Sequence, residues 1–420
     1  MYNIETLPNG VRIISEQNPN VRSVSLGVWI ASGTRQEPPD QNGASHFIEH
    51  MLFKGTERMN AAELADSMDA LGGEINAFTT KECTCFYGRV LDEKLRVFAD
   101  LLADMLFHSR FDETCVETER GVIFEEIGMC DDNPDDLAVE KLMLGVFAGT
   151  PLGYPILGTK ESLRPMTGRA LLDYKNAHYT GDAVVVAVSG HFSGDDLAYI
   201  SRVLGAFPAG ERVRSAECAY RPAFSCVEKA TEQNHIVVGF PALSYLSEQR
   251  YALQILNNVI GGNMSSRLFQ RVREQLGLCY SVNSFLATHA DCGVLSIYIG
   301  TGADSERKAL TEIGRVLAEI AANGVTDAEL AKVRDSIRSG LLMALESTSA
   351  RMNHMGKGLL LQHAVATPDE VAARYLAVRR EEVADLARSL LNPDALSVSA
   401  VTRKGRADRY AQWLLDGLRP

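Results

Sequence analysis

The sequence lacks any long apolar run. No stretch of about 18 consecutive apolar residues, roughly the length that crosses a membrane, occurs among its 420 residues. The first residues, MYNIETLPNGVRIISEQ, also lack the basic start and apolar block of a signal peptide. We therefore expect no membrane span and no signal peptide. A cytoplasmic protein is predicted, and a chain from which a presequence was removed is the alternative.

Positive charge is scarce relative to negative charge. The chain has 42 Lys and Arg against 54 Asp and Glu, which gives a formal net charge of −12. Because a phosphate-binding surface needs an excess of cations, this balance argues against a nucleic-acid partner. It leaves open peptides or partners that carry positive charge.

A cysteine framework is also lacking, although the chain has eight cysteines. Cys83 and Cys85 lie two apart in a predicted strand, so their side chains should point to opposite faces. The spacing of the eight argues against a metal-binding cysteine cluster. Free buried thiols in a reducing compartment are therefore predicted.

What the sequence does contain is the same order of predicted elements twice. Periodicity and composition predict strands in the first half at 9–17, 23–32 and 74–90. Helices are predicted at 44–53, 61–70, 92–107 and 112–129. The second half repeats this order, with a strand at 233–242, a helix at 249–262, two strands within 277–301, and helices at 305–324 and 326–345. A period of about 210 residues predicts two copies of one unit.

The predicted fold class is α+β, with two homologous α/β-roll domains. Each domain is expected to be an antiparallel sheet covered by helices. The boundaries predicted from the repeat are 1–210 and 225–420, with 211–224 as the linker.

One predicted helix combines two histidines and a glutamate with apolar neighbours. Residues 43–56 read GASHFIEHMLFKGT, which contains His46, Glu49 and His50. Positions i and i+4 lie on one helix face about 6 Å apart, a separation that suits two imidazoles on a tetrahedral zinc ion. Glu49 would lie close enough to reach a metal-bound water. The alternative is a pair of core histidines hydrogen-bonded to the backbone.

A third ligand is expected in the helix 116–129, because catalytic zinc has three protein ligands and a water. At about 100° per residue, Glu119 and Glu126 fall in the middle of an apolar stripe, whereas Glu125 points away from it. Two desolvated carboxylates repel each other unless cations lie nearby. A zinc ion with its histidines would supply that charge, and a surface position for Glu119 is the alternative.

His-x-x-Glu-His is the inverted zinc motif, and the chain resembles the pitrilysin/insulinase family of zinc peptidases over essentially its whole length. It is most similar to the short subgroup that includes the catalytic subunit of the mitochondrial processing peptidase. In that subgroup a glutamate follows the second histidine by 76 positions, as Glu126 follows His50 here (126 − 50 = 76). The resemblance implies one zinc ion per chain on His46, His50 and Glu126. It further implies Glu49 as the general base and Glu119 as an acid that supports the ligands.

The second half lacks the metal-binding residues, since Val333 and Gly340 stand where the first half has its two glutamates. The family carries an Arg and a Tyr seven residues apart in this half, which Arg273 and Tyr280 match. The resemblance implies that they reach the substrate across a clamshell formed by the two domains. Both are suitable donors to a developing oxyanion. An exposed Arg and a packed Tyr are the alternative.

Further substrate contacts are implied by the resemblance. Asn76 and Ala77 in EINAFTT match the family's substrate edge, where an extended peptide adds as a β-strand; a turn residue is the alternative for Asn76. Asp136 and Glu140, 10 and 14 positions after Glu126, match acidic residues that recognise substrate arginine in the processing peptidase. A solvated acidic loop is the alternative for this pair.

Together these features predict a zinc metalloendopeptidase that hydrolyses unfolded or short peptides within a closed chamber. The alternative is a non-catalytic scaffold subunit, like the family's core subunits in respiratory complexes, which have lost the motif. This chain retains all four motif residues, which favours the enzyme. Members of this length usually form dimers, so a homodimer or a heterodimer with a related subunit is expected.

Overall fold

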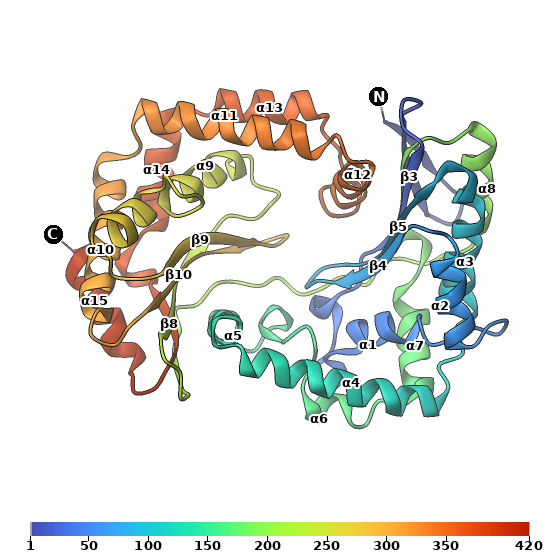
Figure 1. Ribbon diagram of the computed structural model, residues 1–420, viewed down its shortest axis with the longest axis horizontal. Helices are drawn as coiled ribbons and strands as arrows, with labels where there is room; N and C mark the ends of the chain where they lie inside the picture. Colours follow the sequence, from blue (N-terminus) through green and yellow to red (C-terminus); the bar gives the residue numbers. More distant parts are fainter. Residues whose placement is uncertain (1, 420) are drawn as a thin grey trace. The chain divides into compact units, whose positions relative to one another are not determined.

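The computed structural model describes residues 2–419, which form two compact units (Figure 1). The first unit consists of the residues up to 127, together with 154–216 and 342–367. The second consists of 128–153, 217–341 and the residues from 368 onward. No helix within residues 2–419 has both the length and the apolarity that a membrane span requires.

The first unit is built on a six-stranded sheet with the order β1-β2-β6-β3-β5-β4. Its strands are β1 (Asn3–Thr6), β2 (Arg12–Gln17), β3 (Ser23–Ile30), β4 (Glu74–Thr79), β5 (Thr84–Leu91) and β6 (Val184–Gly190). The central strand β6 reads VVVAVSG and is buried along its whole length. Such a continuous apolar run is typical of a strand that is covered on both faces.

The two faces of this sheet are covered by helices from different parts of the chain. One face carries helices that share a single apolar core, namely α1 (Ala44–Met51), α3 (Leu95–His108), α7 (Gly168–His178) and α8 (Gly194–Leu204). The opposite face is covered by α12 (Thr348–Gln362), which packs on β2, β3 and β6. Gly356 permits this approach, because a Cβ there would lie 2.2 Å from Trp29 Nε1.

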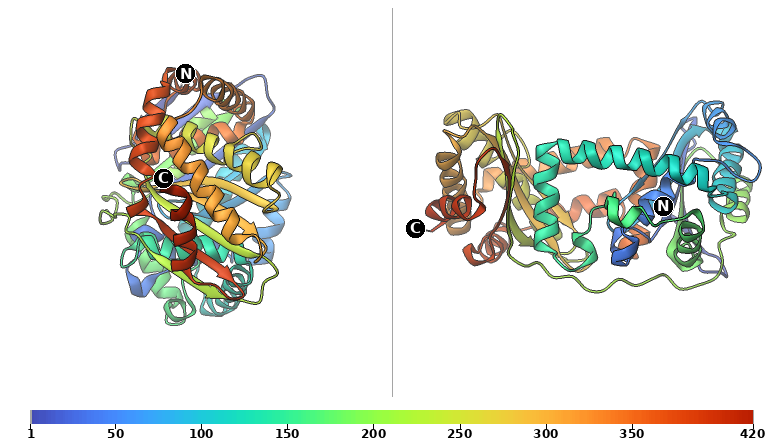
Figure 2. Two further views of the ribbon diagram at one scale, coloured as in Figure 1. Left: turned by 90° about the vertical axis from the view of Figure 1, so that its left-hand side faces the viewer. Right: turned by 90° about the horizontal axis from the view of Figure 1, so that it is seen from below.

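The second unit repeats the plan with a five-stranded sheet in the order β7-β11-β8-β10-β9. The strands are β7 (Phe224–Glu228), β8 (Asn234–Ala242), β9 (Ser281–Thr288), β10 (Gly293–Thr301) and β11 (Ser397–Thr402). One face carries α9 (Arg250–Ile260), α10 (Glu306–Asn323), α14 (Arg380–Leu390) and α15 (Ala407–Leu418). Figure 2 (left) shows the orange to red helices of this group lying over the sheet.

Each unit has received one helix from the other half of the sequence. The sheet of the second unit is covered by α5 (Pro134–Val146), which packs on β7, β8 and β11 as α12 packs in the first unit. The units therefore differ from the predicted ranges 1–210 and 225–420 by one exchanged segment each. Residues 206–223, which include most of the predicted linker, contain no helix or strand.

The predicted α+β class with a repeated unit is present, and one detail of the prediction is corrected. Within residues 2–419 each sheet has one parallel pair, β2 with β6 and β7 with β11, and its other pairs are antiparallel. The reason is that β6 inserts between β2 and β3, which are consecutive in sequence, and runs antiparallel to β3. β11 inserts in the same way between β7 and β8.

The remaining helices include the two long ones that the repeat predicted. These are α4 (Glu113–Asp132) and α11 (Asp327–Ala344). Shorter helices are α2 (Ala61–Asp69), α6 (Lys160–Leu163) and α13 (Pro368–Ala377). Residues Phe269–Gln275 form a π-helical segment, η6, which the periodicity of the sequence did not predict.

Candidate metal centre and catalytic site

Helix α1 is fixed at its N-terminus by a buried carboxylate. Gly43 immediately precedes the helix as its N-cap and has a φ of +96°, a conformation that favours glycine. Glu37 accepts hydrogen bonds from the backbone N–H groups of Gly43 and Ser45, both at 2.8 Å, and from Asn42 Nδ2 at 3.0 Å. Burial raises the pKa of Glu37, and these hydrogen bonds oppose that shift. A carboxylate in this position also interacts favourably with the helix dipole.

The burial of its apolar side determines which side of α1 faces away from the core. Phe47, Ile48 and Met51 are buried in the core of the first unit. The opposite side therefore carries His46, Glu49 and His50, all of them half-buried. The capping by Glu37 was not predicted, because Glu37 lies outside the residue spacings that mark ordinary helix caps.

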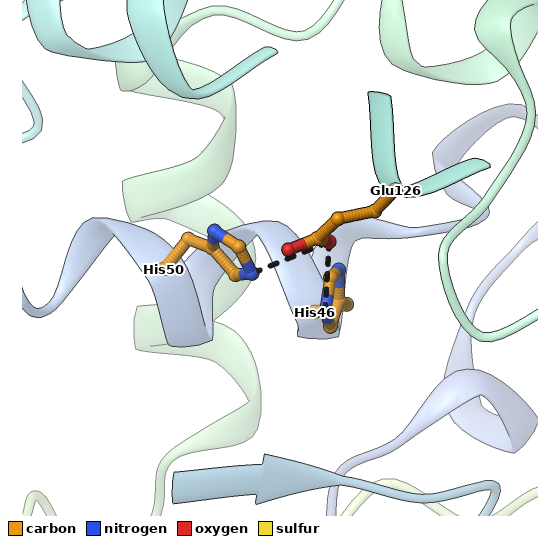
Figure 3. Close-up of side chains that lie close together, drawn as sticks. All are labelled: His46, His50 and Glu126. Atoms are coloured by element: carbon orange, nitrogen blue, oxygen red, sulfur yellow. Dashed lines mark ion pairs between the residues drawn. The ribbon is translucent and has the colours of Figure 1, made fainter. Parts of the chain in front are cut away.

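His46, His50 and Glu126 form a compact group of ligand atoms (Figure 3). Glu126 projects from α4, and its Oε2 lies 3.8 Å from His46 Nε2 and 3.7 Å from His50 Nε2. The imidazole centroids are 4.5 Å apart. In the described part of the chain this is the one such group of three or more His, Cys, Asp or Glu ligands.

The donor set fits a zinc ion. Tetrahedral ligands at roughly 2.0–2.2 Å from zinc lie about 3.3–3.6 Å from one another, close to the separations found here. Burial, with a smaller effect of His50, lowers the pKa of His46 to about 4, so its imidazole is neutral, as ligation requires. Glu126 Oε2 is buried without a hydrogen-bond partner, and a cation at the centre of the three residues would satisfy it.

Glu119 lies directly behind one of the histidines. Its Oε2 is 3.1 Å from His50 Nδ1, and its Oε1 is 2.8 Å from Lys54 Nζ. Because a carboxylate accepts the Nδ1 proton, the lone pair of His50 is on Nε2, the nitrogen that faces Glu126. At 3% exposure, Glu119 does not occupy the surface position considered as an alternative. The contact with Lys54 was not predicted from the sequence.

Glu49 is held by a residue of the neighbouring sheet. Its Oε2 accepts a hydrogen bond from the Thr79 hydroxyl, which comes from the last residue of β4. Burial raises the pKa of Glu49, and the bond from Thr79 opposes this shift. Burial, with a smaller effect of the Glu49 charge, raises the pKa of Tyr179, whose hydroxyl has no hydrogen-bond partner among the described residues. Neither Thr79 nor Tyr179 was predicted.

Asn76 and Ala77 lie on an edge strand. β4 pairs with β5 on one side and with no other described strand. Asn76 lies within the strand, opposite Tyr87, so it is not a turn residue. Its Oδ1 accepts a hydrogen bond from the Ala77 backbone N–H at 2.8 Å. This edge could accept an added strand if the Asn76 side chain moved away from that N–H group.

Arg273 and Tyr280 lie next to each other in the second unit. Arg273, on η6, has its guanidinium carbon 4.5 Å from the centroid of Phe269 and 5.4 Å from that of Tyr280. Tyr280 is 75% exposed, so the alternative of a packed tyrosine does not hold. Substrate contact by these two residues remains a prediction.

Asp136 and Glu140 belong to the first turns of α5. Asp136 is exposed and accepts a hydrogen bond from Asn133 Nδ2 at 2.6 Å, a contact that stabilises the start of the helix. Glu140 is half-buried one turn later. Neither residue belongs to the group around Glu126, and recognition of substrate arginine remains a prediction.

The described residues of the second unit include no counterpart of the metal ligands. On α11, Val333 is buried and Gly340 has no side chain to offer. Arg334 on the same helix donates to the carbonyl of Val378 just before α14. Arg120 on α4 likewise donates to the carbonyl of Met166 just before α7, at 2.6 Å. The duplicated scaffold was thus retained without the metal chemistry.

Comparison with known proteins identifies the family. Residues 12–160 match the family described as insulinase (peptidase family M16), and residues 165–337 match the peptidase M16 inactive domain. The chain belongs to the M16 family. A Bacillus subtilis protein named an uncharacterized zinc protease is 44% identical to this M16 chain over 393 residues, which cover 93% of this chain and 95% of that protein. A Streptomyces coelicolor protein with the same description is 37% identical over 417 residues, covering 96% and 90%.

Solved structures agree with this assignment at the level of the fold. A protease from Helicobacter pylori superposes with a TM-score of 0.90 at 18% identity, covering 96% of the M16 chain and 99% of that protein. A peptidase M16 inactive domain from Pseudomonas fluorescens gives 0.89 at 20% identity, covering 96% and 98%. The predicted family and the two-domain α+β fold are confirmed.

Proposed function

We propose that this M16 chain is a zinc metalloendopeptidase that hydrolyses unfolded or short peptides. The observation that carries the proposal is the group formed by His46, His50 and Glu126. Glu49, a carboxylate outside this group, lies on the same helix as the two histidines. The names of the bacterial relatives, uncharacterized zinc proteases, support the same activity. One zinc ion per chain is expected.

The chain's own residues supply the proton transfers and the positioning. When bound, zinc lowers the pKa of a water towards 7 and polarises the scissile carbonyl. Glu49 Oε2 is occupied by the Thr79 hydroxyl, so Oε1 is the atom that takes the proton of the attacking water. Glu49 then delivers this proton to the leaving amine. Glu119 keeps the proton of His50 on Nδ1 throughout.

Peptide binding is proposed to occur by strand addition to β4. Backbone pairing is largely indifferent to side chains, so such a site would accept extended peptides of varied sequence and exclude folded proteins. The resemblance to the family adds Arg273 and Tyr280 as donors to the substrate in a closed chamber, and Asp136 and Glu140 as readers of substrate arginine. Assembly as a homodimer, or as a heterodimer with a related subunit, likewise rests on the resemblance.

A non-catalytic scaffold role is the second candidate. A chain of complex III2 from Candida albicans shares the fold with a TM-score of 0.83 at 17% identity, covering 98% of this chain and 99% of that chain. The fold alone therefore does not distinguish an enzyme from a complex subunit. The retained ligand group and Glu49 favour the enzyme, because a scaffold has no need of them.

The test is metal analysis combined with cleavage of an unstructured peptide library. The wild-type protein should contain about one zinc per chain and cut the library, and removal of zinc by a chelator should stop cleavage. Glu49→Gln should keep its zinc but cleave at least about 100-fold more slowly, the scale of a lost general base. A stable globular protein should resist cleavage. A zinc-replete wild-type protein that leaves the library intact would support the scaffold instead.

A further inference from the structure

The last residue of β4, Thr79, connects the peptide-binding edge to the general base. We propose that Thr79 is a positioning residue whose hydroxyl orients the Glu49 carboxylate, so that Oε1 faces the attacking water while Oε2 is held by the strand. This inference rests on the proposed function and assigns a role to the residue that holds Glu49 Oε2.

The direction of this hydrogen bond is fixed by chemistry. An ionised carboxylate can only accept, so the Thr79 hydroxyl donates to Glu49 Oε2. Within residues 2–419 no other hydrogen-bond donor reaches this carboxylate. Without Thr79, the orientation of the base would depend on its own side-chain torsions, which sample several states.

Thr79 itself is held firmly in place. In β4, alternate residues point to one face, and Ile75 and Ala77 pack against the core that contains α1. Thr79 continues this row and therefore faces the same helix. A threonine is also restricted about χ1 because its Cβ is branched, so few directions are open to its hydroxyl.

A second threonine, Thr84, lies next to the Thr79 hydroxyl. Thr84 lies opposite Thr79 in the β4–β5 register, and the two Oγ1 atoms are 3.3 Å apart. Thr84 is fully buried and donates its own proton to the carbonyl of Ser32 at 2.8 Å. The proton of Thr84 is thus already in use, and that of Thr79 is directed to the charged acceptor.

The consequence for catalysis is that one strand holds both partners of the reaction. Ala77, at the edge where the peptide is proposed to pair, lies two residues before Thr79 in β4. A peptide that pairs with β4 is therefore held by the same element that orients the base. Because proton transfer depends on orientation within a fraction of an ångström, loss of this hydrogen bond should affect turnover rather than peptide binding.

The test compares three variants in the full-length, zinc-loaded protein. Thr79→Val keeps the shape and removes the hydroxyl, whereas Thr79→Ser keeps the hydroxyl. The matched control is Thr80→Val, because the Thr80 hydroxyl bonds the backbone of Cys83 in the β4–β5 turn, at 2.9 and 3.0 Å, and not Glu49. Steady-state kinetics on an unstructured peptide, zinc content and thermal stability are measured for each.

We expect Thr79→Val to retain its zinc and its KM and to lose about 10- to 100-fold in kcat, the range for residues that support a metal site. Thr79→Ser should recover most of that loss. Thr80→Val should lower the thermal stability and leave kcat within about two-fold of wild type. Wild-type kcat in Thr79→Val, or an equal loss in Thr79→Val and Thr80→Val, would overturn the inference.

A crystal structure of zinc-loaded Thr79→Val provides a readout that does not depend on activity. The Glu49 side chain should adopt a new rotamer or several, whereas an unchanged Glu49 would overturn the inference. Thr79→Ala serves the same purpose if the valine variant does not fold. If the wild-type protein cuts no peptide, the proposed function fails, and the orientation of Glu49 in this structure still decides the role of Thr79.

Discussion

Glu119 Oε2 lies 3.1 Å from Nδ1 of His50, the histidine whose other nitrogen faces Glu126. A buried acid thus holds the imidazole in the tautomer and the orientation that a metal ligand requires. The same acid is paired on its far side with Lys54 Nζ at 2.8 Å. The ligand group is therefore supported by two successive contacts, from His50 to Glu119 and from Glu119 to the half-exposed Lys54.

The assignment of the ligands predicts a clear difference between two adjacent glutamates. Glu126→Gln, like His46→Ala or His50→Ala, should lose zinc, because each removes one of three ligands. Glu125→Gln is the matched control, since Glu125 is exposed on the same helix and belongs to no ligand group. Zinc content by mass spectrometry after dialysis measures the difference. Loss of zinc from Glu125→Gln with retention in Glu126→Gln would reverse the assignment.

Glu119→Gln should weaken zinc binding without abolishing it. The amide can no longer act as a charged acceptor for His50 Nδ1–H, and such losses typically cost about 10- to 100-fold in metal affinity. Competition with a chromophoric chelator measures the affinity. Glu117→Gln is the control, because Glu117 lies two residues away and forms an ion pair with Arg120. Equal affinities in the two variants would show that the contact with His50 does not support the metal.

Lys175 should make the stability of the protein depend on pH. It is 7% exposed on α7, and burial lowers its pKa to about 8. A lowered folded-state pKa means that the contribution of Lys175 to stability is fully present above its ordinary pKa, about 10.5, and is lost as the pH falls through about 8. At neutral pH the chain therefore bears the cost of a buried ammonium group.

The variant Lys175→Met, of similar shape and without charge, should remove this cost. At pH 7 its free energy of unfolding should exceed that of the wild type by on the order of 3–4 kcal/mol, because the pKa of Lys175 falls from 10.5 to about 8 and each pKa unit corresponds to about 1.4 kcal/mol. The difference should shrink as the pH rises from 8 towards 10.5. Urea unfolding between pH 6 and 10 measures it, and a difference that did not change with pH would contradict the prediction.

Arg273→Ala and Tyr280→Phe test the substrate role of the second unit. Both should leave zinc content and thermal stability nearly unchanged, since Tyr280 is exposed and Arg273 lies next to its ring. If they donate to the transition state, kcat/KM should fall by about 10- to 1,000-fold. Arg271→Ala is the control from the same segment, because Arg271 pairs with Glu312 at 3.2 Å. Wild-type kcat/KM in both variants would mean that the two residues do not act on the substrate.

The sequence by itself determined the features that depend on local spacing. His46, Glu49 and His50 are presented together because i, i+3 and i+4 share one side of any helix. Glu126 could be found because a carboxylate in an apolar stripe needs a partner, and the spacing known from the family selected it over Glu119. The repeat was visible because strands and helices follow each other in the same order in both halves.

Tertiary structure alone decided which distant residues support this group. Glu37 caps α1 from a preceding loop, and Thr79 donates to Glu49 from a strand. Lys54, just after α1, forms an ion pair with Glu119 on α4. Each contact depends on where two elements lie relative to each other, and no periodicity in the sequence encodes that.

The exchange of α5 and α12 has the same cause. An apolar helix face shows that the helix packs on something, but not on which sheet. α12 packs on the sheet of the first unit because Gly27 leaves room for Met352. A Cβ at Gly27 would lie 2.4 Å from Met352 Sδ. Local sequence thus determined that α1 carries His46, Glu49 and His50 on one side. Packing between distant segments decided which residues support these three side chains.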